Sequence, residues 1–373
     1  MAPEGRTRIR LAFDATPLRT ARTGVGHFAH QVLAGLATRD DVVVSAYASR
    51  TGRRQLAELL PAGVRAAPSW LPARVVVPIW RRAPWPRVER WTGPVDVVHA
   101  TNFIAPPARA PVVVTVHDLT FVTAPELCRP GTRSLVGLLR RALARGATVH
   151  AVSDHVADEF RAHFDVSSER VVRVYEGVTP AVDGDAESGH RLAGGDAYVL
   201  ALGTIEPRKN LPMLVRAFDA VATDHPELLL VVAGPDGWGR AAFDAAVAAT
   251  SCAPRIRRMG YVADRQRADL LAGATLLAYP SLDEGFGLPP LEAMAAGVPV
   301  VAARAGALPE VLADAALLVD PTDVDDIAAT LDRVLTDSSV RAQLVSRGSV
   351  RAEMFPWSST VDNLVALYKT LAQ

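Results

Sequence analysis

The sequence predicts an α/β protein made of two Rossmann-like domains, each a parallel sheet covered by helices on both faces. Short apolar, β-branched runs alternate with longer segments rich in Ala, Leu and Arg, as expected for buried parallel strands joined by helices. The alternation starts again after a Gly-, Asp- and Ser-rich stretch near residue 190. The length of 373 residues also favours two domains, because one domain usually takes about 100–200 residues.

The predicted elements follow in chain order. Six apolar runs of the first half are expected to be strands, and they begin at Ile9, Val42, Asp96, Val112, Thr148 and Val171. Five runs of the second half are expected to be strands, and they begin at Tyr198, Leu228, Ile256, Leu276 and Val298. We therefore place a first domain over residues 1–182, a linker over 183–196, a second domain over 197–355 and a final helix over 356–373.

Composition excludes several classes of protein. The 40 basic and 40 acidic residues balance, so bulk charge does not favour nucleic-acid binding. Cys128 and Cys252 lie far apart and match no metal or redox spacing, which favours a reducing, cytoplasmic compartment. The N-terminal segment has no apolar region of signal-peptide length, and no run approaches the ~20 apolar residues of a spanning helix. We expect a soluble protein with at most peripheral membrane contact.

The segment Glu284–Glu292, EGFGLPPLE, is the most informative part of the chain. It joins an apolar strand, 276–281, to a helical run through a Gly-rich turn, an arrangement that places anions at a helix N-terminus. The N–H groups of Gly285, Phe286 and Gly287 are candidates to meet a phosphate or a sugar hydroxyl. Two carboxylates at one helix start favour a ligand with hydroxyls, such as a sugar and a ribose.

Other candidates follow strands, where ligands bind in open α/β sheets. Arg208 and Lys209 come after the strand at 198–204, and two cations there can neutralise a diphosphate leaving group without metal. Gly24 and Gly26 follow the first strand and permit close backbone approach to a ligand. His117 ends the strand at Val112, a position that more often faces a cleft than a core.

The pair Glu284 and Glu292, separated by seven residues, resembles the E-x7-E motif of retaining glycosyltransferases with the GT-B fold. Four companion motifs stand in the matching order and span nearly the whole chain: GVG at 24–26, VHD at 116–118, GTIEPRKN at 203–210 and AGVPVVA at 296–302. On these motifs the chain is identified as a member of family 4, similar to its mannosyltransferases.

The resemblance implies an active-site cleft between the domains, with the acceptor held by the first and the nucleotide sugar by the second. It also implies that the last helix crosses back to the first domain. Lys209 would be the diphosphate lysine, with Arg208 replacing an arginine that many relatives carry where this chain has Thr204. His117 would contact the transferred sugar. The loop with Gly24 and Gly26 would lie near the donor phosphates and the acceptor.

For the E-x7-E segment, the resemblance implies that Glu284 binds hydroxyls of the donor sugar and Glu292 both ribose hydroxyls. Gly285, Phe286, Gly287 and Leu288 would line the donor site. The implied reaction is metal-independent front-face transfer of a hexose, with GDP-mannose as first choice of donor. The acceptor would be a glycan, a glycolipid or a small molecule.

Two rival functions stay open: a nucleotide-sugar 2-epimerase on the same architecture, and a catalytically silent nucleotide-sugar-binding scaffold. The segment 70–91 holds four of the six tryptophans and is either an interfacial element or a domain helix with partly buried rings. Asp323 and Asp325 are better explained as caps of a polar helix than as metal ligands. Ser153 fits a helix N-cap at least as well as a ligand contact.

Overall fold

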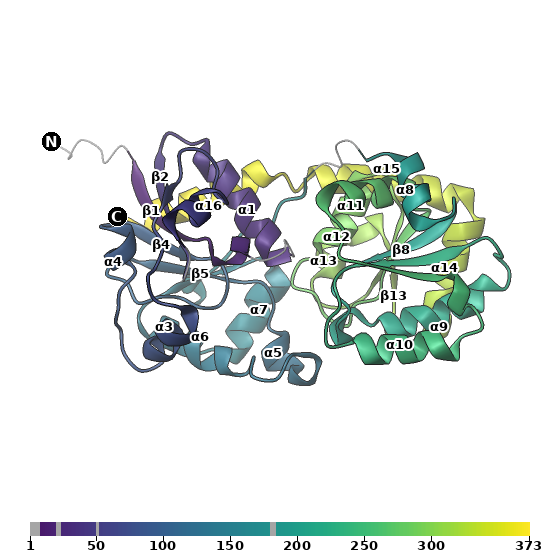
Figure 1. Ribbon diagram of the computed structural model, residues 1–373, viewed down its shortest axis with the longest axis horizontal. Coiled ribbons are helices and arrows are strands. Elements are labelled where there is room, and N and C mark those ends of the chain that lie inside the picture. Colours follow the sequence, from purple (N-terminus) through teal and green to yellow (C-terminus); the bar gives the residue numbers. More distant parts are fainter. Residues whose placement is uncertain (1–7, 20–23, 50–51, 180–183) are drawn as a thin grey trace. The chain divides into compact units, whose positions relative to one another are not determined.

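The computed structural model describes residues 8–19, 24–49, 52–179 and 184–373. The chain forms two compact units. The first consists of Met1–Thr123, Pro130–Gly177 and Trp357–Gln373, and the second of Ala124–Arg129 and Val178–Pro356. Each unit is a parallel sheet with helices on both faces, which confirms the predicted fold class (Figure 1).

The sheet of the first unit has the strand order β3-β2-β1-β4-β5-β6-β7, and every pairing is parallel. Its strands are β1 Ile9–Asp14, β2 Val42–Tyr47, β3 Arg65–Ala66, β4 Val97–Ala100, β5 Val112–Val116, β6 Thr148–Ala151 and β7 Val171–Arg173. Its helices are α1 Gly24–Ala37, α2 Arg53–Ala57, α3 Ala73–Trp80, α4 Glu89–Thr92, α5 Thr120–Thr123, α6 Ser134–Ala144, α7 Asp154–His163 and α16 Trp357–Leu371. From β1 the chain adds strands first on one side and then, from β4 on, on the other side, so the topological switch point of the sheet lies between β1 and β4.

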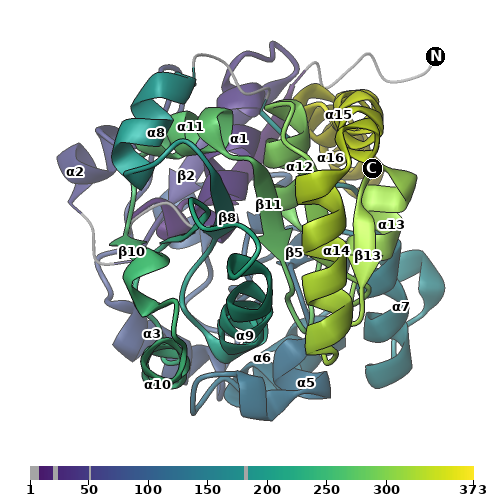
Figure 2. The ribbon, with the colours of Figure 1, turned by 90° about the vertical axis from the view of Figure 1, so that its right-hand side faces the viewer.

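The sheet of the second unit has the strand order β10-β9-β8-β11-β12-β13, also parallel throughout. Its strands are β8 Tyr198–Leu202, β9 Leu229–Ala233, β10 Ile256–Gly260, β11 Leu276–Tyr279, β12 Val300–Ala303 and β13 Leu317–Val319. Its helices are α8 Ala186–Ala193, α9 Leu211–Ala222, α10 Arg240–Ala249, α11 Asp264–Gly273, α12 Leu288–Ala295, α13 Leu308–Leu312, α14 Val324–Thr336 and α15 Ser338–Glu353. Figures 1 and 2 show α9, α10 and α14 on one face of this sheet and α8, α11 and α12 on the other.

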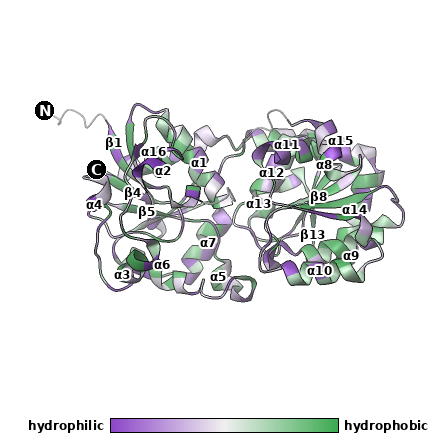
Figure 3. Ribbon diagram, in the orientation of Figure 1, coloured by the Kyte–Doolittle hydropathy of each residue, from purple (hydrophilic) through white to green (hydrophobic). Residues whose placement is uncertain are grey.

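Hydrophobic burial explains the layers. Figure 3 shows hydrophobic strands inside each unit and helices that alternate between hydrophobic and hydrophilic residues. In the first unit one core joins β1 and α1 to α16, whose Leu364, Val365 and Tyr368 are almost fully buried. Helix α16 therefore belongs to the core of the first unit, although the whole main segment of the second unit separates it from the rest in sequence. The described residues include no helix that is long and apolar enough to span a membrane.

A buried chain of hydrogen bonds anchors α16. The Tyr368 hydroxyl lies 2.6 Å from Nδ1 of His99, and Nε2 of His99 lies 2.7 Å from the Thr115 hydroxyl. The Thr115 hydroxyl also lies 2.9 Å from Nδ1 of His150, whose Nε2 donates to the Val174 carbonyl. Burial lowers the pKa of His150 to about 4 and that of His99 well below its usual value. Both rings are therefore neutral at physiological pH.

The structure differs from the sequence expectation in three places. Strands β3 and β13 were not anticipated. Residues 186–193, expected to lie in a linker, form α8, which packs on α11 in the second unit. Asp185 caps α8 by accepting from Ser188 N, and Gly194 ends it in the left-handed conformation, so the polar composition marks helix caps. Residue 183 of that linker lies outside the described residues.

The segment 70–91 contains two short helices, α3 and α4. Trp80 and Trp91 pack on each other with ring centroids 6.3 Å apart, and Trp80 is 7% exposed. Trp70 and Trp85 are 66% and 52% exposed. Two of the four rings therefore stabilise the domain, as the second interpretation of this segment expected. The capping predictions for Ser153 and Asp323 are confirmed by bonds from Val156 N and Asp325 N, respectively.

Candidate active site

The strongest candidate site of the second unit lies at the topological switch point of its sheet, between β8 and β11. Strand β8 ends at Leu202, and Pro207–Lys209 forms a short 3-10 helix before α9. Strand β11 ends at Tyr279, and Glu284 follows in the next loop. Because the two strands are parallel neighbours, their carboxyl ends bring these two loops together at the usual place for a ligand in such folds.

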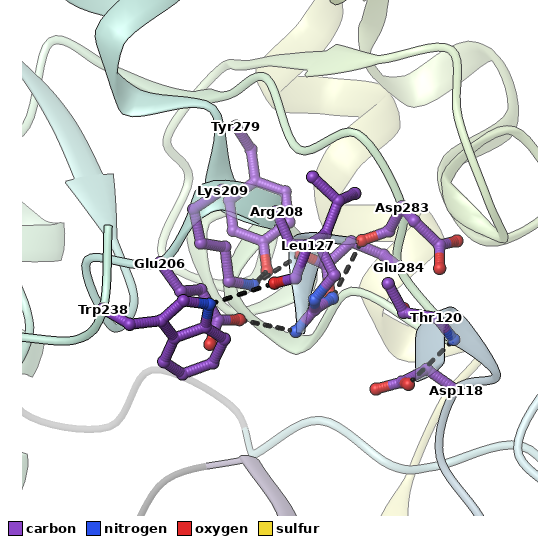
Figure 4. A network of polar contacts seen from close by, with 10 residues as sticks. All are labelled: Asp118, Thr120, Leu127, Glu206, Arg208, Lys209, Trp238, Tyr279, Asp283 and Glu284. Atoms are coloured by element: carbon purple, nitrogen blue, oxygen red, sulfur yellow. Dashed lines mark hydrogen bonds and ion pairs between the residues drawn. The ribbon is translucent and has the colours of Figure 1, made fainter. Parts of the chain in front are cut away.

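Five side chains meet there through direct bonds. The Lys209 ammonium donates to Glu284 Oε1 at 2.5 Å and to the Tyr279 hydroxyl at 2.6 Å. Arg208 donates through Nη1 to Glu284 Oε2 at 2.7 Å and through Nη2 to Glu206 Oε1 at 3.0 Å. Figure 4 shows Lys209, Tyr279 and Glu284 pointing toward one another. Two cations and two carboxylates thus form one compact network.

The network is buried, and this sets its charges. Burial alone would raise the pKa of Glu284, but the charges of Arg208 and Lys209 outweigh it and hold that pKa at about 2. Burial lowers the pKa of Lys209 from its usual value, although the Glu284 carboxylate opposes this effect. Burial likewise raises the pKa of Tyr279 well above 10, so the phenol keeps its proton. The site therefore presents an ionised carboxylate between two cations.

Two glycines allow the loop around Glu284 to close. Gly287, with φ +101°, precedes α12, and a Cβ there would lie 2.6 Å from Leu308 Cδ2. Gly306, with φ +55°, lies so close that its Cβ would come 2.4 Å from the Glu284 carbonyl oxygen. Ala307 N donates to that same carbonyl at 2.8 Å. The loop after β12 therefore fixes the backbone of Glu284.

Glu292 lies in α12 and is 8% exposed. Its Oε2 forms an ion pair with Arg267, which comes from α11. Burial lowers the pKa of Arg267. The arginine orients one oxygen of the carboxylate, and a carboxylate has further acceptor positions for other donors.

In the first unit, His117 follows β5 and already has two partners. Its Nδ1 lies 2.9 Å from Glu176 Oε1, and its Nε2 lies 2.9 Å from the Thr101 carbonyl oxygen. Burial alone would lower the pKa of His117, but the Glu176 carboxylate and the Thr101 carbonyl raise it above its usual value. Both partners are hydrogen-bond acceptors, so the doubly protonated imidazolium is the form of the ring that satisfies both bonds. A ligand that bonded either nitrogen would have to share it with, or displace, one of these acceptors.

Gly24 and Gly26 form the first turn of α1. Gly24 is exposed with open space around its Cα, whereas Gly26 is buried, and a Cβ there would lie 3.2 Å from the Pro17 carbonyl oxygen. Residues 20–23, which precede them, lie outside the described part of the chain.

The structure thus brings Arg208, Lys209 and Glu284 together. Thr204 directly follows Gly203, after β8, and Gly285, Phe286 and Gly287 lead from Glu284 into α12, which begins at Leu288. Sequence reasoning missed two members: Tyr279 and Arg267. The sequence does contain a signal for Tyr279, because it is a polar residue at the carboxyl end of a strand beside the site. Among the described residues, no three His, Cys, Asp or Glu side chains are grouped as a metal site requires.

Comparison with known proteins adds the family. Residues 185–351 match the family model for glycosyl transferases group 1, and residues 22–182 match that for Glycosyltransferase Family 4. The O-antigen chain mannosyltransferase B of Escherichia coli is 33% identical over 284 residues, which cover 74% of this chain and 74% of that protein.

Solved structures agree on the architecture. Sucrose-phosphate synthase from Thermosynechococcus elongatus superposes with a TM-score of 0.78 at 19% identity, over 98% of this chain and 99% of that one. HepE from Anabaena, solved in complex with UDP-glucose, superposes with a TM-score of 0.73 at 18% identity, over 97% of this chain and 100% of that one. At these identities the likeness establishes the fold, which is GT-B.

Proposed function

The chain belongs to the glycosyltransferases of group 1 and family 4, and from this premise we propose that it is a retaining, metal-independent hexosyltransferase. It moves a hexose from a nucleotide diphosphate sugar to a hydroxyl of a glycan or glycolipid. The observation that carries the proposal is the buried network of Arg208, Lys209 and Glu284 at the topological switch point of the second unit's sheet.

The reaction needs charge stabilisation above all. The bond between the anomeric carbon and the diphosphate breaks, and its electron pair stays on the diphosphate oxygen. The Lys209 ammonium has three N–H donors. Two of them donate to Glu284 and Tyr279, and we assign the third to the diphosphate of the donor. Arg208 adds a second cation. A preorganised donor of this kind typically contributes on the order of 3 kcal/mol to lowering a barrier.

For the retaining course we propose front-face substitution, because Glu284 is a poor candidate for an enzymatic nucleophile. Its carboxylate is engaged by two cations, so it is a weak nucleophile and a good acceptor for sugar hydroxyls. We therefore assign it to holding the donor sugar. The acceptor oxygen attacks on the face from which the diphosphate leaves, and its proton passes to the leaving phosphate oxygen. Glu292, oriented by Arg267, accepts from the ribose hydroxyls.

GDP-mannose is our first choice of donor. The support is the relative named as an O-antigen chain mannosyltransferase. A structural neighbour was solved with UDP-glucose, so uridine donors are the comparison to make.

The test is titration calorimetry of GDP, UDP, dTDP and ADP, with and without EDTA. It uses the wild-type protein, Glu292→Ala and the exposed control Glu353→Ala. We expect one nucleotide to bind selectively in EDTA, and to bind at least about tenfold more weakly only in Glu292→Ala. Equal binding by both variants would remove the ribose assignment.

Product analysis then tests the transfer. The matching nucleotide sugar with an acceptor panel should give a product that keeps the donor's anomeric configuration, visible by NMR. Conversion of donor alone into an isomer would identify an epimerase. If the protein binds the nucleotide sugar but leaves it intact in the presence of every acceptor tried, the protein is a scaffold.

A further inference from the structure

Glu176 is a buried carboxylate of the first unit that the chemistry proposed above does not use. It comes shortly after β7 and is 5% exposed. Its Oε1 lies 2.9 Å from Nδ1 of His117, which follows β5, so the pair spans the intervening strand β6 at the carboxyl edge of the sheet. Replacing a buried ion pair by apolar side chains is often neutral or even stabilising. Stability alone is therefore a poor explanation for this pair, and a use of its charge is a better one.

Helix α16 holds the backbone on both sides of Glu176. Before it, the Tyr175 carbonyl accepts from Thr360 Oγ1 at 2.9 Å. After it, Gly177 packs so closely that a Cβ there would lie 2.6 Å from Trp357 Cα. A carboxylate on so firmly packed a segment is preorganised, and such a group orients its partner at little further cost in entropy.

The ring of His117 is fixed on its other sides as well. Its Nε2 lies 2.9 Å from the Thr101 carbonyl oxygen. Phe28 of α1 and Phe103 after β4 pack edge-on against it, with ring centroids 5.1 Å and 6.5 Å away. The side chain keeps 11% of its surface exposed at the carboxyl edge of the sheet, where open α/β sheets bind ligands. The ring is thus held rigidly at a place where its charge can act on a ligand.

Glu176 decides the charge of this ring. The ionisable groups that interact with it electrostatically are Glu176, Asp118 in its own loop, His99 in β4 and His150 in β6. The two other histidines are neutral, as described above. Burial lowers the pKa of His117, but mainly the bond and the charge of Glu176 counteract this, and the pKa stands above its usual value. Without Glu176, burial would favour the neutral ring.

We propose that Glu176 is a positioning residue of the transfer reaction: it holds the His117 ring in one orientation and in its cationic form, and this charge raises the rate of transfer. Negative charge develops on the leaving diphosphate, and a fixed cation favours a step of that kind. Glu176 itself touches no reacting atom and acts only through the ring. The inference rests on the proposed function, because this charge develops only if a diphosphate leaves.

Glu176→Gln is the decisive variant. Its amide can donate to Nδ1 of a neutral ring while Nε2–H still donates to the Thr101 carbonyl, so both hydrogen bonds persist and only the ion pair is lost. Glu169→Gln is the matched control, because it makes the same substitution at an exposed residue of the same unit. His117→Gln and the double variant with Glu176→Gln complete the set.

Two measurements as a function of pH test the proposal. Nitrogen-15 NMR of the histidine rings distinguishes imidazolium from neutral imidazole, and the His117 signals are those that disappear in His117→Gln. At pH 6.5 we expect the wild-type ring to be mainly imidazolium and the ring in Glu176→Gln to be neutral. At pH 8, steady-state kinetics should show kcat of Glu176→Gln lowered about tenfold for each pKa unit that the ring loses, with KM for the donor within about twofold of wild type.

The double variant separates positioning from a general defect. If Glu176 acts only through the ring, the double variant should match the activity of His117→Gln within about twofold. A folding defect would lower the melting temperature of Glu176→Gln, but it would not move the pH at which kcat falls.

Three results would each overturn the inference: a neutral wild-type ring at pH 6.5, a Glu176→Gln enzyme that matches Glu169→Gln at every pH, or a double variant much slower than His117→Gln. Failure of the proposed function looks different. In that case the wild-type protein neither binds a nucleotide nor transfers a hexose, and the inference falls with it, although NMR still reports the charge of the ring. If the inference alone fails, wild-type transfer persists and nucleotide affinity still depends on Glu292.

Discussion

Removing the Lys209 ammonium tests the buried network most directly. Lys209→Ala deletes a cation that lies 2.5 Å from Glu284 and leaves Arg208 as the remaining cation on that carboxylate. The pKa of Glu284 is about 2 instead of 4.5 even though burial opposes this fall, so the two cations together stabilise the carboxylate by at least about 3 kcal/mol. Losing one of them should cost about 1–2 kcal/mol of unfolding free energy.

The cost in catalysis should be larger. If the ammonium stabilises the departing diphosphate, its loss raises the barrier by about 3 kcal/mol, which is a fall in kcat of roughly two orders of magnitude. The assays are initial rates of hexose transfer, nucleotide titration and urea unfolding. The chain offers a matched control, because it has two lysines and the other, Lys369, pairs with Asp41 on the surface of the first unit.

Lys369→Ala should change neither kcat nor stability by a measurable amount, since exposed ion pairs contribute little. A Lys209→Ala enzyme with kcat within about twofold of wild type would refute the assignment. So would equal losses in both variants, because they would point to a general effect of removing an amine.

Three further predictions follow from contacts described above. Tyr279→Phe removes one anchor of Lys209 and should lower kcat about three- to tenfold with nucleotide affinity kept, by steady-state kinetics and calorimetry. His150 is neutral in the fold, with a pKa of about 4 against the usual 6.5, so the unfolded chain takes up the extra proton between these values. His150 should therefore contribute about 3 kcal/mol to the loss of stability as pH drops from 6.5 to 4, and a His150→Gln variant should lose correspondingly less, by urea unfolding at each pH. Gly306→Ala should destabilise by at least about 1 kcal/mol more than Gly260→Ala, because both have positive φ but only Gly306 would meet backbone; thermal melts of the pair decide this.

Much of the fold could be predicted because buried parallel strands are continuous apolar runs. Strands β3 and β13 could not, since two or three residues carry no pattern. Helix α8 was taken for a linker because its caps and small residues resemble loop composition.

The candidate site divides in the same way. Lys209 and Glu284 could be placed at one sheet edge, because both follow parallel strands. Their partners could not: Tyr279 meets Lys209, and Arg267 meets Glu292, through contacts between residues distant in sequence. The occupied ring nitrogens of His117 are likewise a property of the folded core. Sequence indicated which residues follow the strands at this sheet edge, and packing determined the contacts that each of them makes.

The place of α16 in the first unit has a consequence for synthesis on the ribosome. Its core side chains, including Leu364 and Tyr368, emerge only after residues 178–356 have been made. At about 5–20 residues per second, that interval lasts on the order of ten to forty seconds. During this time the second unit has nearly all of its chain and is free to fold, while the first waits with an uncovered hydrophobic face and His99 without its tyrosine. The unit whose translation begins first is thus the last to be completed.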